Sequence, residues 1–192
     1  MPGSERTHNK KRTLVRKNYV RLSATGTEGS KFNGATNQPS HGADRTAHLG
    51  GTKSPIPEID EDSALLRVEA CGTCGSDYEQ YEGVIRAPMP AVPGHEPLGI
   101  VEAIGDRAAR CWGVDVGDRI AVETMLSCRF CSQCLGGRYH LCDERRIYSY
   151  IPLSDEPGLW GAYSEYMFVH GNSIVHKMDK DLAPEIAVMF NP

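Results

Sequence analysis

Residues 128–142 read CRFCSQCLGGRYHLC and place four cysteines, Cys128, Cys131, Cys134 and Cys142, at the spacing C-x2-C-x2-C-x7-C. Each C-x2-C step lets two thiolates converge from one tight turn, and the longer last interval contains two glycines where the chain must bend back. Zinc favours a closed tetrahedron of four sulfurs, which is a structural rather than a catalytic site. We therefore predict one structural zinc ion in a lobe formed by residues 124–146.

An iron–sulfur cluster and a chance grouping of cysteines both fit this spacing less well. Sequence motifs for iron–sulfur clusters typically have a shorter last interval, and a proline commonly follows the last cysteine. Here Asp143 follows the last cysteine. Four unrelated buried cysteines would rarely crowd so closely. The chain has seven cysteines, an odd number, and its polar N-terminus has no apolar core of a secretory signal. Metal ligation in a reducing compartment is therefore favoured over a disulfide framework.

The composition excludes several classes of partner. The 192 residues are 40% hydrophobic and 24% charged, ordinary values for a globular protein and enough chain for about one domain. The net charge of −4 gives no reason to expect nucleic acid or an anionic membrane as partner. No apolar run approaches the ~20 residues that a membrane-spanning helix needs. A cytoplasmic location is the default expectation.

Charge divides the chain into two unlike parts. Residues 1–53 hold 10 Lys and Arg against 3 Asp and Glu, whereas the remaining residues hold 11 against 22. The first part is rich in Gly, Ser, Thr and Asn, and it has too little apolar surface to offset the entropy lost on ordering. We predict that residues 1–54 are a mostly disordered or non-native basic segment, with an organelle transit peptide as the alternative.

Residues 55–192 have the pattern of a mainly β domain with short helices. Leu65–Ala70 alternates like a half-buried strand, and Leu98–Ile104 is a short apolar run closed by Gly105 and Asp106. Further strands are expected within residues 116–122, 163–169 and 174–178. Short strands separated by Gly, Pro and Asp favour a β-barrel or sandwich core.

The end of the chain begins a helix. Pro184 opens an apolar stretch that extends to Phe190, as is typical of a helix with proline in its first turn. Only two residues follow, so we expect that the chain holds part of a longer enzyme. Between the strands, Cys111 is expected in a turn and Trp160 in a packing role.

A second, open metal site is indicated upstream of the four cysteines. Cys74 and, some twenty residues later, His95 offer a thiolate and an imidazole. These are two of the ligands with which a catalytic zinc site is built while one position stays free for water or substrate. The carboxylate of Asp77 could orient His95 without binding the metal itself. Either residue alone would more often be part of a packed core.

Four motifs in order make the sequence recognisable: CGSD at Cys74–Asp77, PGHE at Pro93–Glu96, the four-cysteine lobe, and GAYSEY at Gly161–Tyr166. With them the chain closely resembles the catalytic domain of medium-chain, zinc-dependent alcohol dehydrogenases, from about Ile56 to Pro192. The resemblance implies a GroES-like β-barrel catalytic domain, followed by a nucleotide-binding domain.

The resemblance also implies roles for single residues. Cys74 and His95 would be catalytic zinc ligands, and Glu96 the acidic neighbour that can approach the metal. Ser76 would hydrogen-bond the substrate hydroxyl and pass on its proton. The metal would polarise an alcohol, or an aldehyde or ketone in the reverse direction, for hydride transfer with NAD or NADP.

The sequence departs from the family at three points. No G-x-G-x-x-G follows a strand, so the dinucleotide fingerprint is absent from these residues. Asn191 stands where the family usually has Cys or Glu as a third metal ligand, and an amide oxygen is a weaker zinc partner. Glu79 stands where many members have a His that relays protons, and it is either a carboxylate relay or a solvated surface residue.

Two further interpretations remain open from the sequence. A zinc-stabilised binding module without chemistry is the alternative from another class, although the lobe lacks the second C-x2-C knuckle and the basic, aromatic spacing of a nucleic-acid ribbon. The chain could also be an inactive fragment of a dehydrogenase. The family implies a homo-oligomer for the full-length parent, while the substrate and the choice between NAD and NADP lie outside the sequence.

Overall fold

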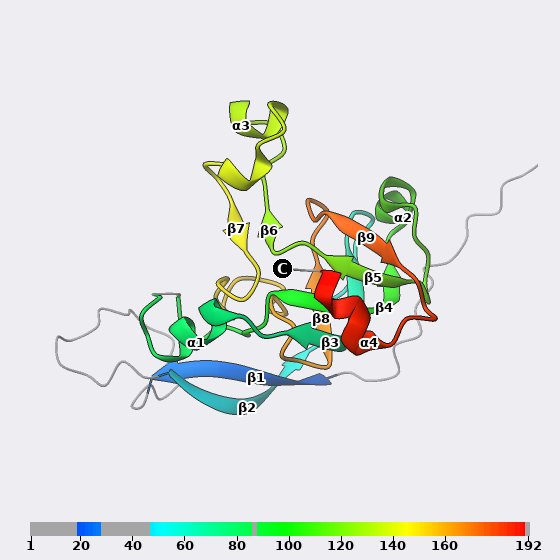
Figure 1. Cartoon of the computed structure of the whole chain (residues 1–192). Helices are drawn as coiled ribbons and strands as arrows, with labels where there is room; N and C mark the ends of the chain where they lie inside the picture. The colour runs from blue at the N-terminus through cyan, green and yellow to red at the C-terminus, as the bar shows by residue number, and fades with distance from the viewer. Residues whose placement is uncertain (1–18, 28–46, 86–87, 191–192) are drawn as a thin grey trace, which may run out of the picture.

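A computed structural model describes residues 19–27, 47–85 and 88–190, with side chains from residue 53 onward. Its centre is a five-stranded antiparallel sheet in the order β8-β3-β4-β5-β9 (Figure 1). The strands are β3 (Ala64–Gly72), β4 (Glu96–Ile104), β5 (Arg119–Val122), β8 (Tyr166–Val169) and β9 (Val175–Met178). The predicted mainly β class is therefore confirmed, and all five strands lie where strands were expected.

The sheet is held by apolar side chains on both of its faces. In β4 every fourth residue is partly buried and the others are buried. Leu66 of β3 pairs with Val101 of β4. Leu65, Leu66 and Leu98 are completely buried, and each such side chain contributes about 1.5–3 kcal/mol relative to an exposed one. Trp160 is also buried in this core, which confirms its predicted packing role.

The segment predicted to be disordered contains two strands. β1 (Tyr19–Thr27) pairs with β2 (Ala47–Pro55) antiparallel along nine residues of each strand. Pairing between the two strands satisfies backbone N–H and C=O groups of both stretches. The prediction of disorder is therefore wrong for these two stretches, and β2 runs through the expected boundary at residue 54. The rest of residues 1–46 lies outside the described part of the chain.

The four-cysteine loop forms a separate lobe that projects from the sheet (Figure 1). Its base is the two-stranded ladder of β6 (Met125–Leu126) and β7 (Arg146–Ile147), and its tip carries α3 (Ser132–Leu135) and the 3-10 helix η1 (Tyr139–Leu141). Arg129 donates to the backbone carbonyls of Asn172 and Ser173. The Tyr139 hydroxyl donates to Glu123 at 2.8 Å. These contacts fix the lobe to the body.

Outside the lobe, two short helices among the described residues were not predicted. α1 (Gly75–Tyr81) follows β3 directly, and α2 (Asp106–Trp112) follows β4. Gly105 is the N-cap of α2 and Gly113 ends it with φ +67, a left-handed conformation that glycine adopts readily. The expected turn around Cys111 is thus a helix.

The last described elements are α4 (Pro184–Ala187) and η2 (Val188–Phe190). Pro184 lies in the first turn of α4, as predicted. The buried Arg119 guanidinium pairs with Glu69 at 2.7 Å and donates to the carbonyl of Leu182 at 2.7 Å, so it holds the segment before α4 against the sheet. Among the helices that the structure describes, none combines the length and apolar character needed to cross a bilayer.

Candidate metal centres

The four cysteines of the lobe meet at one point. Their sulfur atoms all lie within 4.8 Å of one another, with Sγ–Sγ distances of 3.9 Å between Cys128 and Cys134 and 3.5 Å between Cys131 and Cys134. Local structure brings them together, because Cys131 is the N-cap of α3 and Gly137 has φ +75. Backbone N–H groups of Cys128 and Cys131 point at the neighbouring sulfurs.

This sulfur cluster fits a zinc ion. Sulfurs at Zn–S bonds of about 2.3 Å in a tetrahedron lie about 3.8 Å apart, close to the distances in the chain. Hydrogen bonding, led by the backbone of Cys134, lowers the pKa of Cys131 to about 6. Burial and the neighbouring Cys131 thiol raise the pKa of Cys134 to about 11. Four thiolates at this distance would repel one another, and a bound zinc ion would compensate their charge.

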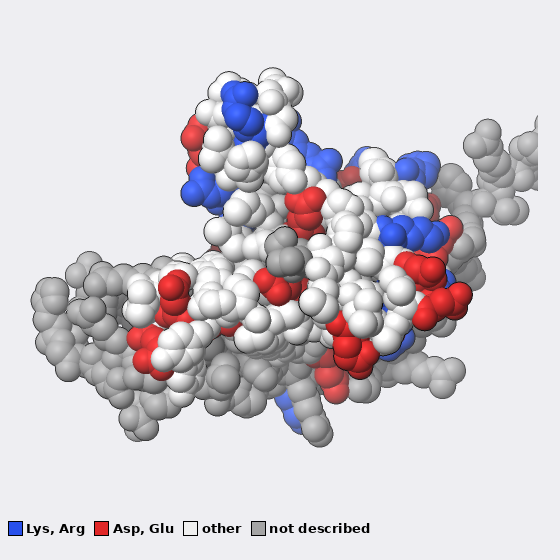
Figure 2. Space-filling view, in the orientation of Figure 1, with Lys and Arg blue, Asp and Glu red and all other residues white. Residues whose placement is uncertain are grey.

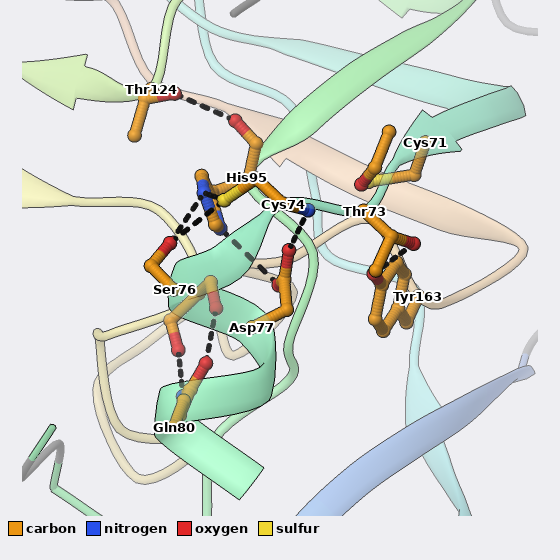
Figure 3. Close-up of polar contacts among 11 residues, drawn as sticks. Cys71, Thr73, Cys74, Ser76, Asp77, Gln80, His95, Thr124 and Tyr163 are labelled. Atoms are coloured by element: carbon orange, nitrogen blue, oxygen red, sulfur yellow. Dashed lines mark hydrogen bonds and ion pairs between the residues drawn. The ribbon is translucent and has the colours of Figure 1, made fainter. Parts of the chain in front are cut away.

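The second predicted site is assembled from the start of α1 and the start of β4. Cys74 is the N-cap of α1, and His95 immediately precedes β4. Cys74 Sγ lies 3.2 Å from His95 Nε2, while Ser76 Oγ lies 2.9 Å from Cys74 Sγ and 3.2 Å from His95 Nε2 (Figure 3). One oxygen of the Glu96 carboxylate lies within 4.8 Å of both donor atoms.

The space for Glu96 comes from a glycine. A Cβ built at Gly72 would overlap the carboxylate of Glu96, so any larger residue at this position would push the carboxylate away. A thiolate, an imidazole and a nearby carboxylate form a donor set that zinc accepts in catalytic sites. The residues present therefore fit a metal ion at this point.

Asp77 lies behind the imidazole of His95, as expected. Its Oδ1 is 3.4 Å from His95 Nδ1, and its Oδ2 accepts the backbone N–H of Cys74 at 2.9 Å. Burial opposes the charged forms of both side chains, yet their interaction lowers the pKa of Asp77 and raises the pKa of His95. One buried carboxylate thus orients both proposed ligands (Figure 3).

Three further residues around His95 were not predicted. Thr124 Oγ1 donates to the His95 carbonyl at 2.8 Å, and the ring of Tyr150 lies 6.2 Å from that of His95. Gln80 is almost completely buried. It forms two hydrogen bonds with Ser149, the residue before Tyr150, at 3.1 and 3.0 Å. These contacts join segments up to 69 residues apart, so no local pattern could indicate them.

A cavity of about 670 Å³ opens beside the second site, with Ser76, His95, Thr124 and Tyr150 among its lining residues. This volume lies in the range of sites for small molecules. Of the other predicted site residues, Glu79 is exposed on α1 and does not line the cavity. Asn191 lies outside the described residues.

Comparison with known proteins gives the family of the chain. Residues 60–180 match the model of the alcohol dehydrogenase GroES-like domain. The chain belongs to this family. The predicted resemblance to medium-chain, zinc-dependent dehydrogenases is therefore confirmed.

Similar proteins carry related names. A Mycobacterium tuberculosis protein named "Probable alcohol dehydrogenase adh" is 49% identical over 140 residues, covering 71% of this chain and 38% of the relative. The erythritol/L-threitol dehydrogenase of Mycolicibacterium smegmatis is 33% identical over 147 residues, covering 71% and 39%. A Sinorhizobium meliloti protein assigned as a zinc-binding dehydrogenase and crystallised with NADP has a TM-score of 0.63 at 25% identity, covering 86% of this chain and 40% of that one.

The chain thus spans less than two fifths of the length of the two mycobacterial relatives. The family match at residues 60–180 includes the central sheet, the lobe and the two groups of residues that could hold a metal ion.

Proposed function

We propose that the chain is the zinc- and substrate-binding domain of a dehydrogenase that interconverts an alcohol and an aldehyde or ketone with NAD or NADP. The observation that carries this proposal is the meeting of Cys74 Sγ, Ser76 Oγ and His95 Nε2 within 3.2 Å of one another at the wall of a cavity large enough for a small molecule. The family membership and the names of the relatives support it.

Each residue of the site has a proposed task. Cys74 and His95 would hold the metal, with Glu96 as an approaching carboxylate and Asn191 as a neutral oxygen donor. A bound zinc ion would act as a Lewis acid that lowers the pKa of the substrate hydroxyl. Asp77 keeps His95 in the orientation that presents Nε2, because it lies against Nδ1.

Ser76 is the residue placed to handle the substrate proton. Its hydroxyl lies beside both metal donors and lines the cavity, so it can accept a hydrogen bond from an alcohol. Glu79 is three residues further along α1, on the same helix face, and it is exposed. We propose that this carboxylate receives the proton from Ser76, through water, and releases it to solvent.

The four-cysteine lobe would carry a second, structural zinc ion. The sequence has no dinucleotide fingerprint, so we expect hydride transfer only when a nucleotide-binding domain is present with this chain. Alcohol-dependent NAD or NADP reduction by the 192-residue chain alone would contradict that expectation.

Alcohol binding tests the proposal without requiring turnover. With Co²⁺ in place of zinc at the Cys74–His95 site, the visible absorption band of cobalt should shift when a neutral alcohol such as 1-butanol is added. Ser76→Ala should weaken this response by roughly fivefold, because about 1 kcal/mol of hydrogen bonding is lost. An unchanged spectrum at saturating alcohol would contradict the proposal.

A further inference from the structure

The cavity beside the second metal centre has two chemically different parts. Ser76 and His95 form one part, and the arginines Arg145 and Arg146 of the lobe belong to the other. One cavity of about 670 Å³ joins them. A ligand that places its hydroxyl at Ser76 can therefore extend to the side of the lobe.

The charge of Arg146 is already compensated. Its guanidinium forms an ion pair with Asp155 at 2.5 Å, and Asp155 lines the same cavity. Its Cζ also lies 5.3 Å from the ring centroid of Trp160, within the range of cation–π contacts. A ligand that bound to Arg146 would have to replace both contacts, so this residue is a poor candidate for recognition.

Arg145, by contrast, leaves most of its donors without a partner among the residues whose side chains the structure describes. Its contact to the chain is a hydrogen bond from Nη1 to the carbonyl of Cys142 at 3.3 Å. A guanidinium has five N–H donors, and no carboxylate forms an ion pair with Arg145 among the residues whose side chains the structure describes. The cavity thus contains one uncompensated positive charge whose planar fork matches a carboxylate or phosphate.

The lobe around Arg145 carries charges of both signs. Residues 124–146 contain four arginines against Asp143 and Glu144, and a zinc ion held by four thiolates would add a charge of about −2, so the zinc-loaded lobe would be close to neutral. In Figure 2 blue and red side chains both lie on the lobe, and red side chains also gather over α1 and near α4. An anionic group entering the cavity would therefore be attracted by the local charge of Arg145 rather than by the net charge of the lobe.

Apart from its polar residues, the cavity is lined by the apolar side chains of Ile85, Pro88, Met125, Ile147, Ile151 and Pro152. Apolar side chains accept a hydrocarbon segment and reject a strongly solvated one. The ligand that satisfies all three parts has a hydroxyl or carbonyl at one end, a short carbon chain, and an anionic group at the other end.

We propose that the substrates of this site are alcohols or carbonyl compounds that carry a carboxylate or phosphate group, and that Arg145 binds this group. The inference rests on the proposed dehydrogenase function and gives its substrate class. The anionic group belongs to the substrate rather than to the nicotinamide cofactor, because Arg145 shares its cavity with Ser76 and His95.

The test compares two ligands of equal shape. Binding of 4-hydroxybutanoate and of its neutral isostere 4-hydroxybutanamide to the zinc-loaded, full 192-residue chain is measured by calorimetry. A charge-assisted hydrogen bond should favour the carboxylate by about tenfold, and added salt should reduce this preference. Arg145→Gln should abolish it.

Arg138→Gln is the matched control. Arg138 belongs to the same lobe and bonds Gln133 at 2.9 Å, but it does not line the cavity. This variant removes the same charge and should keep the tenfold preference. An equal loss in both variants would overturn the proposal, because it would mean that only the overall charge of the lobe matters.

The remaining outcomes separate this proposal from the proposed function. Equal affinity of the wild-type chain for both ligands overturns the role of Arg145 and leaves the dehydrogenase proposal intact. Binding of neither ligand overturns both. If Arg145→Gln leaves the preference for the carboxylate unchanged, Arg145 does not bind the anionic group and the substrate assignment is wrong.

Discussion

Asp77→Asn should weaken zinc binding at the Cys74–His95 site while leaving the chain folded. The Asp77 side chain is 6% exposed, and it serves His95 Nδ1 at 3.4 Å and the Cys74 N–H at 2.9 Å. An asparagine oxygen can still accept the Cys74 N–H, so the start of α1 is retained. The lost interaction is the carboxylate behind the imidazole.

The magnitude follows from the geometry. Replacing a carboxylate that orients a ligating His typically costs 10–100-fold in metal affinity, which corresponds to about 1.4–2.7 kcal/mol. Because 3.4 Å is longer than a strong charge-assisted hydrogen bond, we expect a loss near the lower end, about tenfold. Competition with a chromophoric chelator measures the affinity for the more weakly held zinc ion.

Glu82→Gln is the control for this experiment, because Glu82 is the exposed C-cap residue of α1. The control should bind both zinc ions as the wild type does. Urea unfolding of the metal-free variants should give the same transition slope for both. If Asp77→Asn retained wild-type zinc affinity, the carboxylate would have no influence on His95 and the reasoning would be refuted.

Three further changes test other parts of the structure. Cys142→Ser should remove one zinc ion per chain and lower the midpoint of thermal unfolding, because a buried thiolate ligand is lost; metal analysis and calorimetry measure the two effects. Gln80→Ala should lower the free energy of unfolding by about 2–4 kcal/mol, since two buried polar groups of Ser149 lose their partners; a urea titration that shows less than about 1 kcal/mol would speak against this. A hydrogen bond from the Lys177 ammonium is the main reason that the pKa of Asp118 is lowered from 3.8 to about 2. A carboxylate with a lowered pKa stabilises the fold at pH values above its unfolded pKa. This contribution is lost as the pH falls toward the folded pKa. The stability advantage of the wild type over Asp118→Asn, on the order of 1 kcal/mol after solvent screening, should therefore be present at pH 6 and absent near pH 2, as acid-dependent unfolding curves would show.

The strands of the central sheet could be predicted because their signal is local. Leu98–Ile104 is apolar almost throughout, and such a run has few alternatives to a buried strand. The pairing of β1 with β2 has no comparable signal, since Gly, Ser and Thr are frequent in both strands. Their order arises from backbone pairing between segments that are distant in the sequence, which composition does not express.

Helices α1 and α2 have local sequence signals that indicate where a helix starts or ends. Asp77 stands at the third position of α1 and accepts the N–H of the N-cap residue Cys74, the arrangement of a capping box. Gly113 follows α2 in the left-handed conformation, a common helix end. Both helices have seven residues, too short for a clear periodic pattern, so strand and turn signals prevailed.

The candidate sites also contain some residues that the sequence could indicate and others that only the folded structure brings together. The four-cysteine cluster could be predicted because all its ligands lie within one loop. Cys74 and His95 are 21 residues apart, so their ligand chemistry indicated a shared site only weakly until the resemblance to a family supported it. Thr124, Tyr150 and Arg145 reach the same cavity from segments with no distinguishing motif, so tertiary structure alone brings them to the site.

The central claim is that this one chain holds two zinc ions, and metal content tests it most directly. Zinc per chain is measured on purified protein after a mild chelator wash, for the wild type and for the double variant Cys74→Ser, His95→Ala. The account predicts two zinc ions in the wild type and one in the variant. One zinc ion in both would mean that only the four-cysteine lobe binds metal, and it would contradict the proposed catalytic site.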